Sequence, residues 1–354
     1  GQGFAGAAAG HEAPLVAALT GPVVHAAAGG TFVNPVRAQT FDLSSGHGLA
    51  QMTPPAAGTS LATGALDYVG DRLVTVDVTG NADEWNARTG AHLFSLPGSG
   101  FAEAVGYSKD GSMIAIAHLP PIPATVRFQT QLGNIGIDLW DARTGHLLRR
   151  IAGDQLSSQI PGTKDFGTLA LAFSPDGKRV GVSGAQPYIE LYATSSGQQV
   201  GHLNPNGEYV GSLAFSPDGK LLAAGTAASA FVWRLPDPHA LPEFQHADAS
   251  QYGFEAPSVG VQVGFTADSR ILVTSGDFAL EAWDPADHQQ LFKVFAAHGA
   301  LNPAGTQFAA ATANGVSVYP CDLCGNLPHL LAVAKRDTTR DFTPSERRTY
   351  LTQG

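Results

Sequence analysis

The chain has 354 residues, of which 44% are hydrophobic and 14% charged, with a formal net charge of −10. This length exceeds what one compact core usually holds and favours several domains or a repeated small unit. The acidic balance argues against nucleic-acid binding, which needs a basic face. No apolar run approaches the roughly 18 residues of a membrane span. We therefore predict neither a nucleic-acid partner nor a membrane partner.

Cysteine usage indicates the compartment. Cys321 and Cys324 are the only cysteines, and the chain has no Asn-x-Ser/Thr glycosylation site. Because a secreted protein of this size usually carries more disulfides, we predict a reducing, cytoplasmic location. The excess of Arg over Lys, 14 to 6, and the abundant Ala favour a GC-rich bacterial genome. The chain starts at Gly1 rather than at Met, so we expect a segment or a processed product of a larger protein.

Aromatic residues end strand-like runs at intervals of 36 to 55 residues along the chain. The run after Trp85 reads Asn-Ala-Arg-Thr-Gly and the run after Trp140 reads Asp-Ala-Arg-Thr-Gly, which are both turn sequences. The seven anchors are Phe41, Trp85, Trp140, Tyr192, Trp233, Trp283 and Tyr319.

A second kind of turn recurs in phase with these anchors. Residues 174–177 and 216–219 both read Ser-Pro-Asp-Gly, each between two apolar runs, and weaker copies lie at 108–111, 266–269 and 302–305. Pro presets φ for the turn, and Asp and Gly tolerate the remaining conformations. Four short strands per unit, repeated about seven times, are typical of a β-propeller, in which stacked neighbours create the core. We predict an all-β, seven-bladed propeller of four-stranded antiparallel blades over residues 1–325.

With these turns and Trp-Asp endings, the chain resembles the WD-repeat (WD40-like) family, particularly its divergent bacterial members. The family's Gly-His dipeptide is present at Gly10-His11. The resemblance implies that residues 3–9 form the outermost strand of the last blade and close the ring. The family's His–Ser/Thr–Asp–Trp network is mostly missing, since Thr79 and Ala228 stand where its Asp would fall.

The C-terminal residues 326–354 differ from the repeats. Residues 327–335 have helical spacing, and Thr343-Pro344-Ser345-Glu346 is a capping box with Pro at the first helical position. We predict a helical tail, either a pair of helices that cover an exposed blade edge or a docking arm. It resembles tails that follow propellers in GC-rich bacterial regulators, which implies the regulatory part of a larger signalling protein.

Connections along the chain alternate between the two ends of the propeller. We predict tight turns at one end and long connections at the other. The long connections span residues 29–37, 118–133, 153–164 and 245–257. Long loops in compact domains are usually functional or disordered, and proline-stiffened apolar or aromatic side chains suit a protein partner. The alternative is that these side chains fold back over the blades. The candidate interaction rim consists of Pro121, Arg127, Phe128, Lys164, Tyr252 and Phe254.

Signals for chemistry are sparse. Cys321 and Cys324 are compatible with a redox pair, packed thiols or half of a zinc site, for which His329 is one nearby further ligand. No H-E-x-x-H, G-x-S-x-G or phosphate-binding loop occurs. Asp67 and Glu103 are the only carboxylates that we place in the central channel. We predict a non-catalytic interaction or sensor domain that needs no cofactor and no metal. The alternative is a propeller hydrolase or lyase with a metal or acid/base site in that channel.

Overall fold

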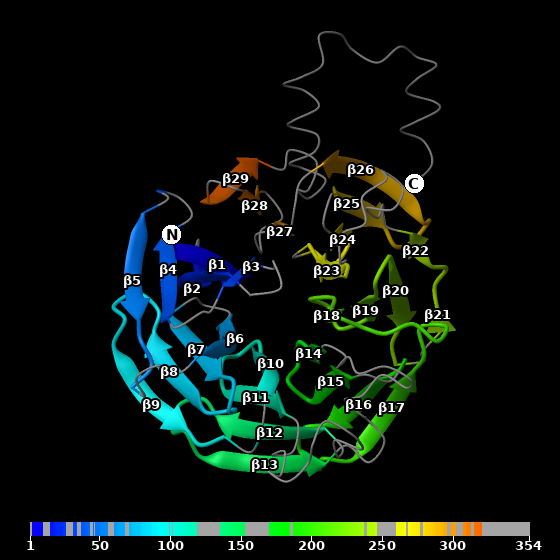
Figure 1. The fold of residues 1–354 in the computed structure, drawn as a ribbon. Helices are drawn as coiled ribbons and strands as arrows, with labels where there is room; N and C mark the ends of the chain where they lie inside the picture. The colour runs from blue at the N-terminus through cyan, green and yellow to red at the C-terminus, as the bar shows by residue number, and fades with distance from the viewer. Residues whose placement is uncertain are drawn as a thin grey trace.

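The computed structural model places seven β-sheets radially around a central axis (Figure 1). It describes residues 2–320 apart from 10–14, 26–30, 34–36, 43–44, 46, 56–59, 68–70, 99, 101, 119–134, 153–169, 185–186, 237–238, 246–259, 267, 277–278, 296–298, 302–306 and 313–314. Within this part of the chain all regular structure is β-strand. The predicted all-β, seven-bladed architecture is confirmed.

Each blade is a continuous stretch of chain whose strands run in order from the axis outward. Blade 1 contains β1 (Gln2–Ala9), β2 (Leu15–His25), β4 (Arg37–Asp42) and β5 (Gly48–Met52), and β3 (Thr31–Val33) pairs with the end of β2. Blade 2 contains β6 (Leu61–Leu66), β7 (Arg72–Asp77), β8 (Ala82–Asn86) and β9 (His92–Leu96). Blade 3 contains β10 (Ala102–Tyr107), β11 (Met113–His118), β12 (Gly136–Asp141) and β13 (Leu147–Ala152). Blade 4 contains β14 (Ala170–Phe173), β15 (Arg179–Ser183), β16 (Ile189–Ala193) and β17 (Gln199–Leu203).

Of the remaining blades, 5 and 7 depart from four strands and blade 6 has four. Blade 5 contains β18 (Ser212–Phe215), β19 (Leu221–Gly225) and β20 (Ser229–Arg234), and two short strands, β21 (His239–Ala240) and β22 (Phe244–Gln245), both pair with β20. Blade 6 contains β23 (Gln262–Phe265), β24 (Leu272–Ser275), β25 (Ala279–Asp284) and β26 (Gln289–Phe295). Blade 7 has three described strands, β27 (Gly299–Leu301), β28 (Gln307–Thr312) and β29 (Gly315–Pro320). Every predicted aromatic anchor lies on the third strand of its blade.

The hydrophobic core lies between blades. The second strands are buried almost throughout, as in β7 and β11, because each is covered by a blade on both sides. Val74 and Val76 of blade 2, for example, pack in one cluster with Ile114 and Trp140 of blade 3. Outer strands such as β9 are exposed except at one end. A single blade cannot bury its faces alone, so the ring supplies the stability.

The predicted role of residues 3–9 is wrong. They lie in β1, which pairs antiparallel with β2 and is the innermost strand of blade 1, not the outermost strand of the last blade. The connection 10–14 is short, so this local pairing costs less loop-closure entropy than pairing with a blade some 300 residues away. The predicted helical tail, 326–354, lies outside the described residues.

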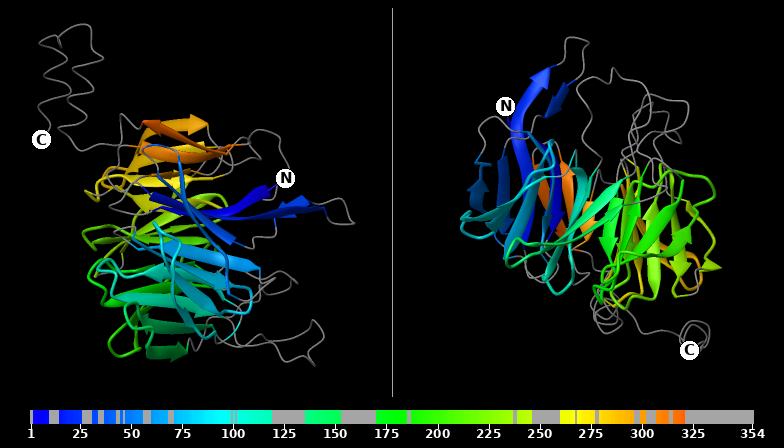
Figure 2. Two further views of the ribbon diagram at one scale, coloured as in Figure 1. Left: turned by 90° about the vertical axis from the view of Figure 1, so that its left-hand side faces the viewer. Right: turned by 90° about the horizontal axis from the view of Figure 1, so that it is seen from below.

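The two ends of the propeller differ. Where the structure describes them, the connections from first to second and from third to fourth strands are tight turns at one end, which we call the turn end. The other connections leave from the opposite end, which we call the connection end, because neighbouring strands are antiparallel. Figure 2 shows β2 and β3 of blade 1 extending beyond the ring at the connection end.

Candidate functional site

The candidate interaction rim lies outside the described residues. Pro121, Arg127 and Phe128 fall in 119–134, Lys164 in 153–169, and Tyr252 and Phe254 in 246–259. All three segments join strands at the connection end, since they follow β11, β13 and β22. The candidate redox pair, Cys321 and Cys324, also lies outside the described residues.

Tight turns at the turn end satisfy their own polar groups. In blade 4, the Ser174 hydroxyl donates to Oδ1 of Asp176 at 2.6 Å and accepts from the Arg179 amide at 2.9 Å. Gly177 has a φ of 67°, a left-handed conformation that favours glycine. The hydrogen bond from Ser174 holds the pKa of Asp176 below its usual value. The same hydroxyl–carboxylate pair recurs as Ser108–Asp110, Ser216–Asp218 and Thr266–Asp268. These carboxylates are committed to turn structure.

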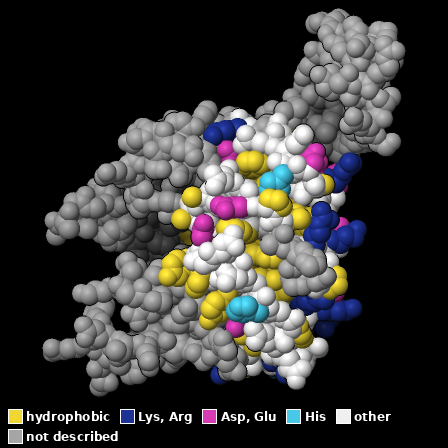
Figure 3. All heavy atoms as spheres, turned by 90° about the vertical axis from the view of Figure 1, so that its right-hand side faces the viewer, with side chains coloured by type: hydrophobic (Ala, Val, Ile, Leu, Met, Phe, Trp, Pro, Cys, Tyr) yellow, Lys and Arg dark blue, Asp and Glu magenta, His cyan; other side chains and the backbone are white. Residues whose placement is uncertain are grey.

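Charges of both signs cover the turn end. Lys178, Lys220 and Arg270 are exposed in three of these turns, and Lys and Arg side chains gather along the right-hand edge of Figure 3. Asp176 and Asp218 are exposed in the same turns. The turn end is therefore a mixed-charge surface rather than a field of one sign.

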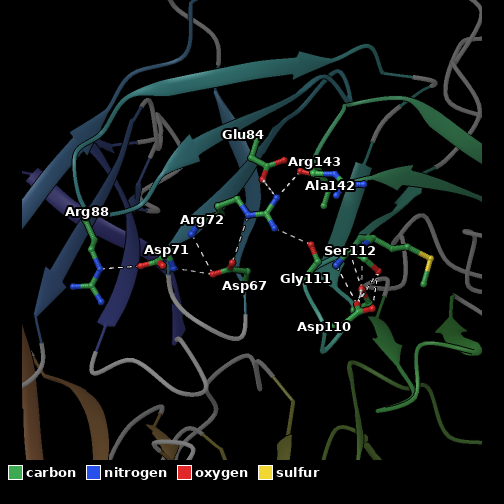
Figure 4. Close-up of polar contacts among 12 residues, drawn as sticks. Asp67, Asp71, Arg72, Glu84, Arg88, Asp110, Gly111, Ser112, Ala142 and Arg143 are labelled. Carbon is green, nitrogen blue, oxygen red and sulfur yellow. Dashed lines mark hydrogen bonds and ion pairs between the residues drawn. The ribbon is translucent and has the colours of Figure 1, made fainter.

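One guanidinium joins blade 2 to blade 3 at the turn end. Arg72, the first residue of β7, donates from Nη1 to the carbonyl oxygen of Ala142 at 2.6 Å and from Nη2 to that of Gly111 at 2.9 Å. Its Nη1 lies 3.2 Å from Oε1 of Glu84, and its Nε lies 3.6 Å from Oδ2 of Asp67. Figure 4 shows these contacts converging on Arg72. Blade 2 supplies both carboxylates, whereas blade 3 supplies both carbonyl groups.

Glu84 is the fully buried acid of this group, with 0% of its surface exposed. Burial raises its pKa to about 7, because the cost of desolvating the carboxylate outweighs the attraction of Arg72. Tyr107 of β10 is also buried, and burial, followed by the Glu84 charge, raises the pKa of its hydroxyl. A hydrogen bond from the Tyr107 hydroxyl lowers the pKa of Glu84, but by less than burial raises it. We call Asp67, Arg72, Glu84 and Tyr107 the Arg72 cluster.

The two carboxylates expected in the central channel give no channel site. Asp67 closes the turn after β6, where its Oδ1 accepts from the amides of Asp71 and Arg72 at 2.9 and 3.1 Å. The side chain of Glu103 is outside what the structure describes. Among the described residues no group of three or more His, Cys, Asp or Glu is arranged to hold a metal ion. The described part of the chain also holds no apolar helix of membrane-spanning length.

Carboxylates recur two residues before the aromatic anchor on third strands, and they pair with the fourth strand. Asp138 accepts from Nε of Arg150 at 2.8 Å, and Oε1 of Glu281 lies 3.3 Å from Nζ of Lys293. Nε2 of His118 lies 3.5 Å from Oδ1 of Asp138, at the end of β11 from which the 119–134 segment departs. Such cross-strand pairs fix register within a blade, so we assign them a structural role.

Part of the WD-repeat hydrogen-bond network is present. Nε1 of Trp85 donates to Oγ1 of Thr75 at 2.9 Å, and Nε1 of Trp283 donates to Oγ1 of Thr274 at 3.0 Å. Thr79 lies in the turn between β7 and β8, where the Asp77 carboxylate accepts its amide and hydroxyl hydrogens. Blades 2 and 6 thus keep the Trp–Thr bond of a network that we predicted to be mostly missing.

The Arg72 cluster was missed by the sequence reasoning, although a signal for it exists. The signal is the residue immediately before the Trp anchor on each third strand. It is Leu139, Val232 or Ala282 in blades 3, 5 and 6, but Glu84 in blade 2. A charge at a repeat position that is otherwise aliphatic indicates a buried polar partner. The partner, Arg72, is close in sequence, whereas Tyr107 becomes its neighbour only through blade stacking.

Comparisons with known proteins agree with this fold. Residues 195–234 match the family "WD domain, G-beta repeat". Cell division cycle protein cdt2 of Schizosaccharomyces pombe is 27% identical over 167 residues, 43% of this chain and 34% of that protein. WD repeat-containing protein SL1-17 of Schistosoma mansoni is 31% identical over 88 residues, 25% of this chain and 26% of that protein. The matches thus span about a third or less of these relatives.

A chain of a solved structure described as "Crystal Structure of Mitotic Checkpoint Complex" superposes with a TM-score of 0.64 at 12% identity, covering 89% of this chain and 86% of that one. The predicted resemblance to the WD-repeat family is therefore confirmed, and the fold is that of a WD40 propeller. Such propellers are generally non-enzymatic scaffolds for protein interactions. Both relatives are eukaryotic, so the bacterial origin stays a prediction.

Proposed function

We propose that this chain is a non-catalytic propeller that binds a protein partner at its connection end, as the regulatory part of a larger signalling protein. The observation that carries the proposal is the difference between the two ends. Turns at the turn end are short and bonded internally, whereas the connections 119–135, 153–169 and 246–261 all leave from the other end. Binding residues concentrate on loops that a rigid scaffold positions.

The connection end also carries described structure beyond the ring. The β2–β3 pair extends outward there, with Val23, Val24 and His25 opposite Val33, Phe32 and Thr31 (Figure 2). An extension of this kind enlarges the surface that a partner can contact at that end. Residues 121, 127, 128, 164, 252 and 254 remain our proposed contacts on the neighbouring connections.

The similar proteins support a role in protein assemblies. One is named a cell division cycle protein, and the superposed chain comes from a structure whose title names a complex. From the composition we propose a cytoplasmic protein. We also propose that residues 1–325 form the propeller domain and that residues 326–354 form a helical tail, which covers a blade edge or docks a partner.

The experiment compares two sets of substitutions at opposite ends. The connection-end variant carries Phe128→Ala, Tyr252→Ala and Phe254→Ala, and the turn-end control carries Lys178→Ala, Lys220→Ala and Arg270→Ala. Partners captured by the wild type are identified, purified and titrated against all three proteins. We expect the connection-end variant to lose affinity at least tenfold with an unchanged Tm, and the control to bind as the wild type does. Loss of affinity in the turn-end variant alone contradicts the proposal.

A further inference from the structure

We infer that the junction between blades 2 and 3 is a proton-operated latch, closed when Glu84 binds a proton and prone to open when Glu84 is charged. This inference does not depend on the proposed partner. It rests on the position before the aromatic anchor, which carries a buried charge in blade 2 and an aliphatic residue such as Leu139 or Leu191 in other described blades.

Apolar side chains of both blades pack across this junction, and at its turn end the Arg72 side chain adds polar contacts to them. Both hydrogen bonds that Arg72 donates to blade 3 end on backbone oxygens, those of Gly111 and Ala142. Gly111 lies in the turn between β10 and β11, and Ala142 in the turn between β12 and β13. The Ala142 amide donates to the Ser112 carbonyl oxygen at 2.8 Å, so a backbone hydrogen bond joins the two turns. The position of Arg72 on blade 2 therefore affects how firmly these two turns of blade 3 are held against blade 2.

The carboxylates of Asp67 and Glu84 hold Arg72 in place, and Glu84 is the more deeply buried of the two. The charged and titratable groups that face Glu84 are Arg72 from β7, Asp67 from the turn after β6 and Tyr107 from β10. With Glu84 ionised, Asp67, Arg72 and Glu84 sum to one negative charge. With Glu84 protonated, the sum is zero. A buried net charge is costly, so ionisation disfavours the closed junction and hydration on opening relieves it.

The Glu84 carboxyl also faces a hydroxyl group of blade 3. The buried hydroxyl of Tyr107 interacts with this carboxyl as a hydrogen-bond partner. The Tyr107 hydroxyl can donate to the ionised carboxylate and can accept from the protonated one, so proton uptake at Glu84 need not break this contact between the blades. Proton uptake thus removes the Glu84 charge while its contact with Tyr107 can be kept.

The size of the effect follows from the shift in proton affinity. The pKa of Glu84 is about 7 in the closed junction and 4.5 for an ordinary glutamate. The opening equilibrium constant should therefore rise by about tenfold between pH 6 and pH 8. Physiological pH lies within this range, so small changes in pH alter the population of open junctions.

Amide hydrogen exchange by NMR on the wild-type chain tests the latch. The reporters are the amides of Gly111 and Ala142, in the two turns that Arg72 holds. Their controls are the equivalent amides of Gly177 and Thr194 in blade 4, which donate to Ser174 and Lys178. After correction for intrinsic exchange, we expect protection at Gly111 and Ala142 to fall about tenfold from pH 6 to pH 8, with little change at the controls. Equal changes in both blades overturn the inference.

Two further measurements separate proton binding from opening. A carboxyl ¹³C titration of Glu84 should have its midpoint near neutral pH, and a midpoint below pH 5 overturns the inference. In Glu84→Gln the pH dependence of the Gly111 and Ala142 protection should disappear, while in Glu190→Gln, a buried third-strand control in blade 4, it should remain. If Glu84→Gln does not fold, the wild-type exchange and titration decide the matter.

Discussion

Trp85 and Thr75 form a hydrogen bond of 2.9 Å between neighbouring strands of blade 2, with both side chains buried. In the next blade the equivalent indole has no partner: Nε1 of Trp140 is buried without a hydrogen bond. The register explains the difference. Trp85 pairs with Leu73, and Thr75 lies two residues further along β7, whereas Trp140 pairs with Ile114 and the corresponding residue is Ile116. The Thr75 hydroxyl thus decides whether the indole of the aromatic anchor has an acceptor.

Removing the acceptor in blade 2 should destabilise the propeller. Thr75→Val keeps the shape of the side chain but leaves the Trp85 indole nitrogen unpaired, so we expect a loss of about 1–3 kcal/mol in the free energy of unfolding. Urea denaturation measures it. In a Trp85→Phe background the same substitution should cost less, by about 1 kcal/mol. An identical cost in both backgrounds contradicts the assigned bond.

An acceptor supplied for the Trp140 indole in blade 3 should contribute stability only when Trp140 is present. Ile116→Thr loses apolar burial, but its hydroxyl lies where Thr75 lies in blade 2 and can accept from Nε1 of Trp140. We therefore expect the substitution to cost about 1 kcal/mol less in the wild type than in a Trp140→Phe background. Chemical denaturation of the four proteins closes the cycle. A cost that is greater in the wild type than in Trp140→Phe disproves the register argument.

Gly225 should be intolerant of any side chain. A Cβ there would lie 1.8 Å from the carbonyl oxygen of Val261 and 2.5 Å from Oγ of Ser212. The Val261 carbonyl oxygen already accepts a hydrogen bond from the Ser212 hydroxyl at 2.7 Å, and this bond links blade 5 to the residue before β23. We expect Gly225→Ala to cost about 3 kcal/mol. Gly211→Ala is the matched control, because nothing lies within 4 Å of its Cβ position; thermal unfolding should show a much smaller loss there.

Local sequence patterns predicted the parts of the fold that depend on nearby residues. The Ser-Pro-Asp-Gly turns and the aromatic anchors placed the blades correctly, since their hydrogen bonds close within five residues, as between Ser174 and Arg179. Contacts between blades were harder to predict. Arg72 and Ala142 are 70 residues apart, and no local pattern indicates which carbonyl group a guanidinium meets after stacking.

The strand of residues 3–9 was misassigned for a related reason. Its composition fits an inner or an outer strand, and the resemblance to ring-closing relatives favoured the outer one. The structure pairs it with β2 through the short connection after Ala9. Strand-like composition alone does not identify the partner of a terminal segment.

Glu84 should make the stability of the chain depend on pH. Burial raises its pKa from 4.5 to about 7, so the folded chain binds this proton more tightly than the unfolded chain. Its stabilising contribution is complete below pH 4.5 and is lost as pH rises through 7, by up to about 3 kcal/mol. Relative to the wild type, Glu84→Gln should therefore gain stability between pH 5 and pH 8. Denaturation at these two pH values measures the difference, and Glu190→Gln is the control. If the stability difference between Glu84→Gln and the wild type is the same at pH 5 and pH 8, another group causes the pH dependence.

The polar junction should be replaceable by the apolar one that the next blade uses. In blade 3, Met113 occupies the position of Arg72 and Leu139 that of Glu84. Arg72→Met alone leaves the Glu84 carboxylate and two backbone oxygens without their donor, so we expect a loss of about 3–5 kcal/mol at pH 8. Adding Glu84→Leu removes the stranded charge and should recover most of that loss, because apolar replacements of buried ion pairs are often neutral. The loss in the single variant should shrink at pH 5, where Glu84 is neutral. Denaturation of the single and double variants at both pH values tests the argument. A double variant less stable than Arg72→Met would mean that Glu84 stabilises the junction independently of Arg72.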